Sequence, residues 1–295
     1  MTVHPRRSVL YMPGTNARAL EKAKTLAADG VILDLEDSVA PDAKESARRQ
    51  VAEAVKAGGF GARQVFIRVN AIDTPWHVED LAAAAQAAPD AILVPKVSNP
   101  ETLELVGRRL LDMHIDHKTR VWAMIETPLA ILNIAGIAAS AKAPGARLAC
   151  FVMGTNDLVK ETRADLSNNR RPALYWLSAA ITAARAYGLD ALDGVYNNFR
   201  DTEGCRRECV HGRALGFDGK TLIHPDQIAV ANEVFAPPET EVAWARKIIA
   251  AFDLPEHKGK GVITVDGRMV ELMHAEMARR TVAIAEAIVA NGPQT

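Results

Sequence analysis

The chain has 295 residues, 48% of them hydrophobic and 24% charged, which is the composition of a globular protein with a sizeable core. Lys and Arg number 35 and Asp and Glu 36, so the formal net charge of -1 provides no basic footprint for nucleic acid or an anionic membrane. The longest apolar run is too short to span a bilayer and no signal-type segment follows the first seven residues, so we expect a cytoplasmic protein without nucleic-acid or membrane partners.

Short apolar runs rich in β-branched residues recur along the chain, as in parallel strands that are buried on both faces. They occupy 9–12, 31–35, 65–69, 91–94, 121–125, 148–153, 191–196 and 219–223. Helical segments are predicted at 16–28, 43–57, 78–88, 100–111, 174–187, 202–215 and 225–235. This order predicts an α/β fold of the (β/α)₈ TIM barrel type. A doubly wound sheet is less favoured, because no Gly-x-Gly-x-x-Gly loop follows the first strand.

The last part of the chain has a different pattern. A helix is predicted at 241–252, a hairpin at 262–270 around Asp266-Gly267, and an amphipathic helix at 275–289. We therefore expect a barrel domain over 1–240 and a C-terminal helical and hairpin extension over 241–295, which needs a surface to pack on.

Polar residues gather where the predicted strands end. Because the carboxyl ends of barrel strands meet on one face, we expect these side chains to converge there. They are Asp34, Glu36, Asp37, Arg68, Asn70, Lys96, Glu126, Asp157, Asp193 and His224. Glu126 and Asp157 are the best metal candidates, since hard oxygen ligands without His or thiolate select Mg²⁺. The alternative is that each carboxylate pairs with a Lys or Arg at the barrel rim.

Three further residues each admit two interpretations. Glu36 and Asp37 either bind the water molecules of a metal ion or, at Asp37, cap the following helix. Arg68 lies in an otherwise apolar strand, where its guanidinium fork suits a carboxylate or an oxyanion. It could equally form a structural ion pair with Glu36 or Asp34.

Lys96 could be a phosphate contact, a Schiff-base amine or a rim charge, and nothing nearby favours the Schiff base. His224 reads as a packed residue rather than a catalyst. No nucleophile elbow, P-loop or Cys/His metal spacing occurs in the sequence.

Nine stretches, in order over nearly the whole chain, resemble the citrate lyase β-subunit-like proteins of the aldolase/citrate lyase superfamily, which includes malyl-CoA and citramalyl-CoA lyases. They are Arg7-Ser8-Val9-Leu10-Tyr11-Met12-Pro13-Gly14, Leu33-Asp34-Leu35-Glu36-Asp37-Ser38-Val39-Ala40-Pro41, Arg68-Val69-Asn70, Pro95-Lys96-Val97, Ile125-Glu126-Thr127-Pro128, Gly154-Thr155-Asn156-Asp157-Leu158, Gly216-Phe217-Asp218-Gly219-Lys220, His224-Pro225-Asp226-Gln227 and Gly267-Arg268-Met269-Val270.

The resemblance implies a barrel with a C-terminal extension that reaches a neighbouring subunit in a homo-oligomer, a trimer or a dimer of trimers. Mg²⁺ would be held by Glu126 and Asp157, which would also position the substrate. Glu36 and Asp37 would reach the metal through water. Arg68 would contact the substrate, and the loop at Pro13-Gly14, with Lys22 and Lys96, would lie near coenzyme A.

One position departs from the family pattern. Malyl-CoA lyases and citrate lyase β subunits have an Asp after the C-terminal Lys/Arg-Met/Leu-Val segment, placed in a neighbouring subunit's site as catalytic base. Glu271 stands there in this chain, one methylene longer. Glu271 is therefore a candidate base, and the alternative is that it begins the terminal helix as a favourable carboxylate.

The function implied is a Mg²⁺-dependent carbon–carbon lyase. It would cleave or form a 3-hydroxyacyl-CoA such as malyl-CoA or citramalyl-CoA, with acetyl-CoA and a small α-keto acid as the other partners. Three alternatives stay open: a malyl-CoA-type thioesterase, a citrate lyase β subunit acting on an acyl-carrier thioester, and a non-catalytic acyl-CoA-binding barrel.

Overall fold

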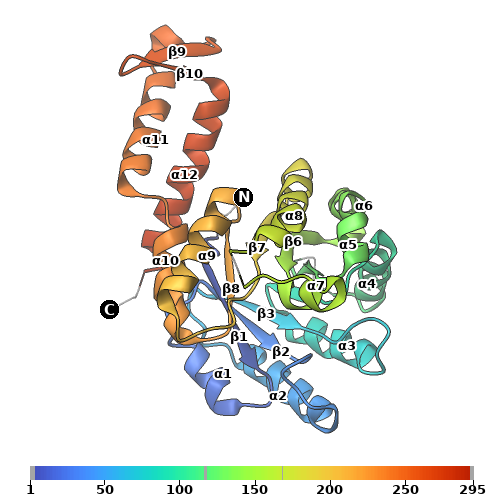
Figure 1. Ribbon diagram of the computed structural model, residues 1–295. Helices are drawn as coiled ribbons and strands as arrows, with labels where there is room; N and C mark the ends of the chain where they lie inside the picture. The colour runs from blue at the N-terminus through green and yellow to red at the C-terminus, as the bar shows by residue number, and fades with distance from the viewer. Residues whose placement is uncertain (1–3, 116–117, 168, 293–295) are drawn as a thin grey trace. The chain divides into compact units, whose positions relative to one another are not determined.

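The computed structural model describes residues 4–115, 118–167 and 169–292. Eight parallel strands close into a barrel in chain order, and β8 pairs with β1 (Figure 1). Their bounds are β1 Ser8–Pro13, β2 Gly30–Asp34, β3 Gln64–Arg68, β4 Ala91–Val94, β5 Arg120–Ile125, β6 Leu148–Met153, β7 Asp190–Asp193 and β8 Gly219–Leu222. The predicted (β/α)₈ barrel is confirmed.

Helices surround this barrel on the outside (Figure 1). They are α1 Ala17–Ala23, α2 Lys44–Ala57, α3 His77–Ala87, α4 Pro100–Asp112, α5 Pro128–Leu132, α6 Ile134–Ala139, α7 Thr155–Thr162, α8 Leu174–Ala186, α9 Thr202–Leu215 and α10 Ile228–Phe235. Short 3₁₀ turns occur at Pro41–Ala43, Ser140–Lys142, Pro144–Ala146, Arg171–Ala173, Pro225–Gln227 and Pro255–His257.

The helices that the sequence analysis did not predict are short. α5 has 5 residues, α6 has 6 and α7 has 8, too few for an apolar period to stand out. α5 begins by local capping, because the Thr127 side chain accepts a hydrogen bond from the Ala130 N–H and Pro128 occupies the first helical position. Two predicted elements were too long, since α1 ends at Ala23 and β7 at Asp193.

The barrel interior is a packed apolar core. Every second residue of a strand points inward, and the Phe66 and Trp122 rings lie 3.8 Å apart between centroids. The Arg6 guanidinium lies 5.0 Å from the centre of the Trp122 ring. The buried interior residues are Val9, Ile32, Phe66, Ala91, Leu93, Trp122, Met124, Cys150, Val152 and Leu192.

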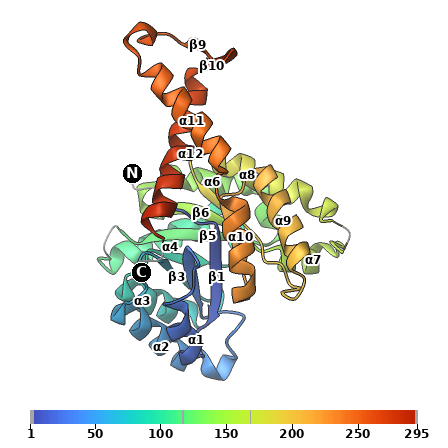
Figure 2. The same cartoon turned by 90° about the vertical axis from the view of Figure 1, so that its left-hand side faces the viewer.

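The C-terminal segment forms a second compact unit that begins after Phe235. The sequence analysis predicted this boundary after residue 240. The unit contains α11 Glu239–Phe252, the antiparallel hairpin β9 Val262–Val265 and β10 Arg268–Glu271, and α12 Leu272–Ala290. Figure 2 shows α11 and α12 side by side. Its own core is Ala245, Ile248, Phe252, Ile263, Val265, Val270, Ala275 and Ala278. Within the described ranges, no helix combines the length and apolar character needed to cross a bilayer.

Candidate active site

A cavity of about 360 Å³ opens at the carboxyl ends of the barrel strands. Five of the residues predicted to converge there line it: Asp34, Asp37, Arg68, Glu126 and Asp157. Its other lining residues are Tyr11, Ser38, Met124, Met153, Gly154, Thr155, Asn156, Val195, Thr221 and Ile223. Strand ends far apart in the sequence therefore contribute to one hollow.

Arg68 makes the structural ion pair that the sequence analysis left open. Its Nε lies 2.6 Å from Asp34 Oδ1 and its Nη2 lies 2.7 Å from Asp34 Oδ2. The two residues are register partners on β2 and β3. This two-point contact uses one edge of the guanidinium and fixes its plane, so Nη1 is left as the nitrogen at the other edge.

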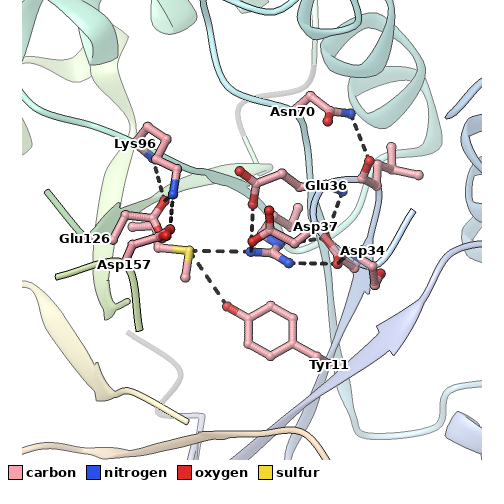
Figure 3. A network of polar contacts seen from close by, with 12 residues as sticks. Tyr11, Asp34, Glu36, Asp37, Asn70, Lys96, Glu126 and Asp157 are labelled. Atoms are coloured by element: carbon pink, nitrogen blue, oxygen red, sulfur yellow. Dashed lines mark hydrogen bonds and ion pairs between the residues drawn. The ribbon is translucent and has the colours of Figure 1, made fainter. Parts of the chain in front are cut away.

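Glu36 and Asp37 meet Arg68 at that second edge (Figure 3). Arg68 Nη1 lies 2.6 Å from Glu36 Oε2 and 3.3 Å from Asp37 Oδ2. Burial raises the pKa of Glu36 to about 8, although the Arg68 charge opposes this rise. Asp37 is exposed, so its carboxylate faces the solvent side of the cavity.

Glu126 and Asp157 converge on a single cationic group, the ammonium of Lys96 (Figure 3). Lys96 Nζ lies 3.6 Å from Glu126 Oε1 and forms an ion pair with Asp157. Glu126 is only 1% exposed, and its burial raises its pKa in spite of Lys96. The alternative interpretation of these two carboxylates, an ion pair at the barrel rim, is thus the arrangement in the structure.

Backbone geometry after β4 holds Lys96 against Glu126. Lys96 has a φ of 56°, in the left-handed region that a residue with a side chain rarely adopts. In this conformation its backbone N–H donates a hydrogen bond of 2.8 Å to Glu126 Oε1. Strained backbone of this kind persists where surrounding contacts fix it, which is common at functional sites.

Gly154, directly after β6, makes room for the Glu126 carboxylate. A Cβ atom at Gly154 would lie 2.4 Å from Glu126 Cβ and 2.6 Å from Glu126 Oε2, so no larger residue fits without displacing that side chain.

The donor set fits a hard divalent cation. The carboxyl groups of Asp34, Glu36, Asp37, Glu126 and Asp157 outnumber the two cations Arg68 and Lys96 at this site, so the site has more oxygen donors than these two cations require. In the part of the chain that the structure describes, no three His, Cys, Asp or Glu side chains form a metal cluster on their own. Two carboxylates with water and substrate oxygens are the arrangement that Mg²⁺ commonly uses.

The remaining predicted residues lie in different places. Lys22 is exposed on α1, after the loop at Pro13-Gly14. His224 stacks on Phe199 with ring centroids 4.6 Å apart, consistent with a packed residue. Glu271 ends β10 in the C-terminal unit, where its side chain accepts a hydrogen bond from the backbone at the start of α12.

Asp193 was wrongly expected at the site. It is fully buried on the opposite face of its strand, where Arg170 Nη1 lies 2.8 Å and Lys220 Nζ 3.1 Å from its carboxylate. Its neighbour Leu192 belongs to the barrel interior, so alternation turns Asp193 outward toward the helices.

Tyr11 and Met124 were missed by the sequence analysis, yet both line the cavity. Their spacing along the strands could have identified both residues as inward-facing. Tyr11 is two residues after Val9 and Met124 two residues after Trp122, and both of those belong to the inward-facing core.

The chain is similar in sequence and in fold to proteins that act on coenzyme A esters or bind coenzyme A. The family described as HpcH/HpaI aldolase/citrate lyase matches residues 7–225. A (3S)-malyl-CoA thioesterase of Cereibacter sphaeroides is 48% identical over 289 residues, which cover 98% of each chain. The mitochondrial citramalyl-CoA lyase of Homo sapiens is 32% identical over 299 residues, covering 96% of this chain and 86% of that one. The solved structure of CitE from Mycobacterium tuberculosis in complex with magnesium, acetoacetate and coenzyme A has a TM-score of 0.72 at 29% identity, covering 94% of this chain and 97% of that chain.

Proposed function

Because the chain belongs to the HpcH/HpaI aldolase/citrate lyase family, we propose that it is an enzyme of acyl-CoA esters and that it hydrolyses the thioester of a malyl-CoA-like 3-hydroxyacyl-CoA. The observation that carries this proposal is the 48% identity, over 98% of the chain, to a protein named (3S)-malyl-CoA thioesterase. The carbon–carbon lyase that the sequence analysis placed first becomes the second candidate, since the citramalyl-CoA lyase is only 32% identical.

Glu126 and Asp157 are proposed to hold Mg²⁺, together with water and substrate oxygens, and Glu36 and Asp37 to hold water molecules beside it. The CitE structure contains magnesium, which supports this assignment. When bound, the ion would supply Lewis acidity and a template for the carboxylate and hydroxyl oxygens of the acyl group. Lys96, which now lies between the two carboxylates, would be released from them and could contact coenzyme A near the loop at Pro13-Gly14 and Lys22.

In hydrolysis, a water oxygen forms a bond to the thioester carbon and the carbonyl π pair moves onto the oxygen. When this intermediate collapses, the carbon–sulfur bond breaks and the coenzyme A thiolate leaves and takes up a proton. Arg68 Nη1 would stabilise the charged oxygen, since donors placed where charge develops contribute about 3–4 kcal/mol each. A base must remove the proton from water, and Glu271 of a neighbouring subunit in a homo-oligomer is the candidate.

The lyase reaction would place charge on the same atom. In the lyase reaction a base instead takes the proton of the substrate hydroxyl, the oxygen forms the carbonyl of an α-keto acid, and the bond to the carbon next to the thioester breaks. The electron pair of that bond forms the enolate of acetyl-CoA, which then takes up a proton on carbon. That enolate carries its charge on the thioester oxygen, which the same Arg68 nitrogen would face. The two candidate reactions therefore differ in which bond breaks, and product analysis separates them.

The test is incubation of the purified protein with Mg²⁺ and (3S)-malyl-CoA, followed by assays for free thiol, malate and glyoxylate. Free thiol and malate without glyoxylate support the thioesterase. Glyoxylate and acetyl-CoA without free thiol overturn it in favour of the lyase. Glu126→Gln and Asp157→Asn, checked for folding by circular dichroism, should each abolish Mg²⁺-dependent turnover, and activity that persists in chelator would remove the metal from the proposal.

A further inference from the structure

We propose that the Tyr11 hydroxyl is a hydrogen-bond donor to the thioester oxygen, acting together with Arg68, in the space between these two donors that the Met124 sulfur now faces. The inference rests on the proposed function, because it concerns the oxygen on which charge develops in either candidate reaction.

The position of Tyr11 is set by β1. Val9 is part of the barrel interior, so strand alternation turns Tyr11 into the same space one level nearer the carboxyl ends. Its ring packs against the Arg68 guanidinium, which lies 4.9 Å from the ring centre. Figure 3 shows the Tyr11 hydroxyl on the side of the ring that faces Glu126 and Asp157. The side chain is thus held from one side by a residue that is itself fixed by Asp34.

The Tyr11 hydroxyl has only a weak partner among the residues that the structure describes. It lies 3.9 Å from Met124 Sδ, and a thioether sulfur is a poor acceptor. Burial raises the pKa of Tyr11 well above its ordinary value, so the phenol keeps its proton and stays a neutral donor. The Tyr11 side chain is partly buried and lines the cavity, and the one hydrogen-bond partner of its O–H group among the described residues is this sulfur. An oxygen of a bound ligand would be a better acceptor.

Arg68 aims at the same atom. Its Nη1 also lies 3.9 Å from Met124 Sδ, while the other edge of the guanidinium is occupied by Asp34. The same Nη1 contacts Glu36 at 2.6 Å and Asp37 at 3.3 Å, so a ligand oxygen would replace the longer contact to the exposed Asp37. Two donors, one from β1 and one from β3, therefore converge on one sulfur that comes from β5 (Figure 3). A carbonyl oxygen that accepts from both donors would have to lie closer to each of them than the sulfur does, at about 2.7–3.1 Å, as in an oxyanion site.

The Met124 side chain can move away from the two donors. A methionine side chain is unbranched, has three rotatable bonds and adapts readily to a changed space. When the thioether turns away, the carbonyl oxygen of a thioester would receive one hydrogen bond from Tyr11 and one from Arg68. Both bonds would strengthen as the carbonyl π pair moves onto the oxygen, and no proton leaves Tyr11 in the step.

The test is Tyr11→Phe, which keeps the ring against Arg68 and removes only the hydroxyl. With malyl-CoA and Mg²⁺ we expect kcat to fall by about 10²–10³, the loss seen when one oxyanion donor is removed, while KM changes by no more than a few fold. Tyr175→Phe is the matched control, because Tyr175 is 63% exposed on α8 and does not line the cavity. Its kcat should equal that of the parent protein.

A binding measurement gives a second readout that does not depend on turnover. S-Carboxymethyl-CoA places a charged oxygen near the position of the thioester oxygen, so Tyr11→Phe should weaken its binding at least tenfold and leave the binding of free coenzyme A unchanged. A variant with parental kcat and parental affinity for S-carboxymethyl-CoA would overturn the role of Tyr11 alone. A parent protein that neither binds nor converts any acyl-CoA would instead overturn the proposed function and this inference with it.

Discussion

Asp34 and Arg68 form a buried two-point ion pair between neighbouring strands, with Arg68 Nε 2.6 Å from Asp34 Oδ1 and Nη2 2.7 Å from Oδ2. Both side chains are almost fully enclosed, at 2% and 8% exposure. The Arg68 and Ser38 contacts keep the pKa of Asp34 below its ordinary value although burial alone would raise it. Asp34 therefore fixes the guanidinium that faces the cavity.

Replacing Asp34 with Asn should damage both stability and turnover. The substitution leaves Arg68 without its main counter-charge, and loss of one partner of a buried pair costs about 3–5 kcal/mol. Urea unfolding measures the first effect and the malyl-CoA assay the second. Asp29→Asn is the control, since Asp29 pairs with Arg7 at the opposite end of the strands. It should lower stability but not kcat at saturating substrate, and an equal loss of kcat would refute a specific role for the Asp34 pair.

Lys96→Met should tighten the binding of Mg²⁺. The Lys96 ammonium occupies the position between Glu126 and Asp157, and a divalent ion must displace it. Removing this competing cation should raise Mg²⁺ affinity several-fold in calorimetry without substrate. The exposed Lys56, replaced in the same way, provides the comparison. Weaker or unchanged binding would show that the metal does not occupy this position.

Gly154→Ala should lower Mg²⁺ affinity although the new residue is not a ligand. Its Cβ would lie 2.6 Å from Glu126 Oε2, so the carboxylate must move. We expect at least a tenfold loss of Mg²⁺ affinity with a small change in melting temperature. Gly188→Ala tests for a general effect of adding a methyl group, because Gly188 has no atom within 4 Å of the added Cβ, although its φ of 70° adds local strain. Unchanged metal binding in Gly154→Ala would count against Glu126 as a ligand.

Asp193→Asn should destabilise the barrel in a pH-dependent way. Burial opposes the charge of Asp193, but Lys220 and Arg170 keep its pKa below the ordinary value. A depressed folded-state pKa adds stability above the unfolded pKa of about 3.9, and this stability is lost as the pH falls through the folded pKa. The free-energy difference between parent and variant, from urea titrations, should be largest at pH 7 and shrink below about pH 4. A difference that stays constant with pH would contradict this role.

Glu271→Gln separates capping from catalysis. The Glu271 side chain accepts a backbone hydrogen bond at the start of α12, and Gln keeps an acceptor oxygen there. The melting temperature should stay close to that of the parent, while turnover should fall strongly if Glu271 is the base. Glu271→Ala should in addition lower stability by about 1 kcal/mol. Parental turnover in Glu271→Gln would place the base elsewhere.

The alternation of inward-facing and outward-facing residues along each strand explains how much of the site could be predicted from the sequence. Asp34, Arg68 and Glu126 follow inward-facing residues of their strands by two positions, so their convergence follows from alternation once the barrel is recognised. The same rule would have excluded Asp193, which follows the inward-facing Leu192 by one position. It would also have found Tyr11, which the sequence analysis assigned to the first strand without placing it in the site.

The ion-pair partners of the site residues were harder to predict than the positions of those residues in the barrel. Nothing in the sequence decides whether Glu126 and Asp157 face a metal or Lys96, because both arrangements satisfy the same charges. The left-handed backbone of Lys96, which directs its N–H to Glu126, carries no local sequence signal such as glycine. The short helices α5 and α6 depend on the capping at Thr127 more than on any apolar period.

The tilted rings of Phe66 and Trp122, with Arg6 against Trp122, have a consequence for the order in which ligands leave the cavity. They lie one layer below Arg68 and Met124, which follow them by two positions on their strands and line the cavity, so buried aromatic rings form its floor. Under the proposed function, a small acid bound against this floor beneath coenzyme A would leave only after the coenzyme has left the cavity.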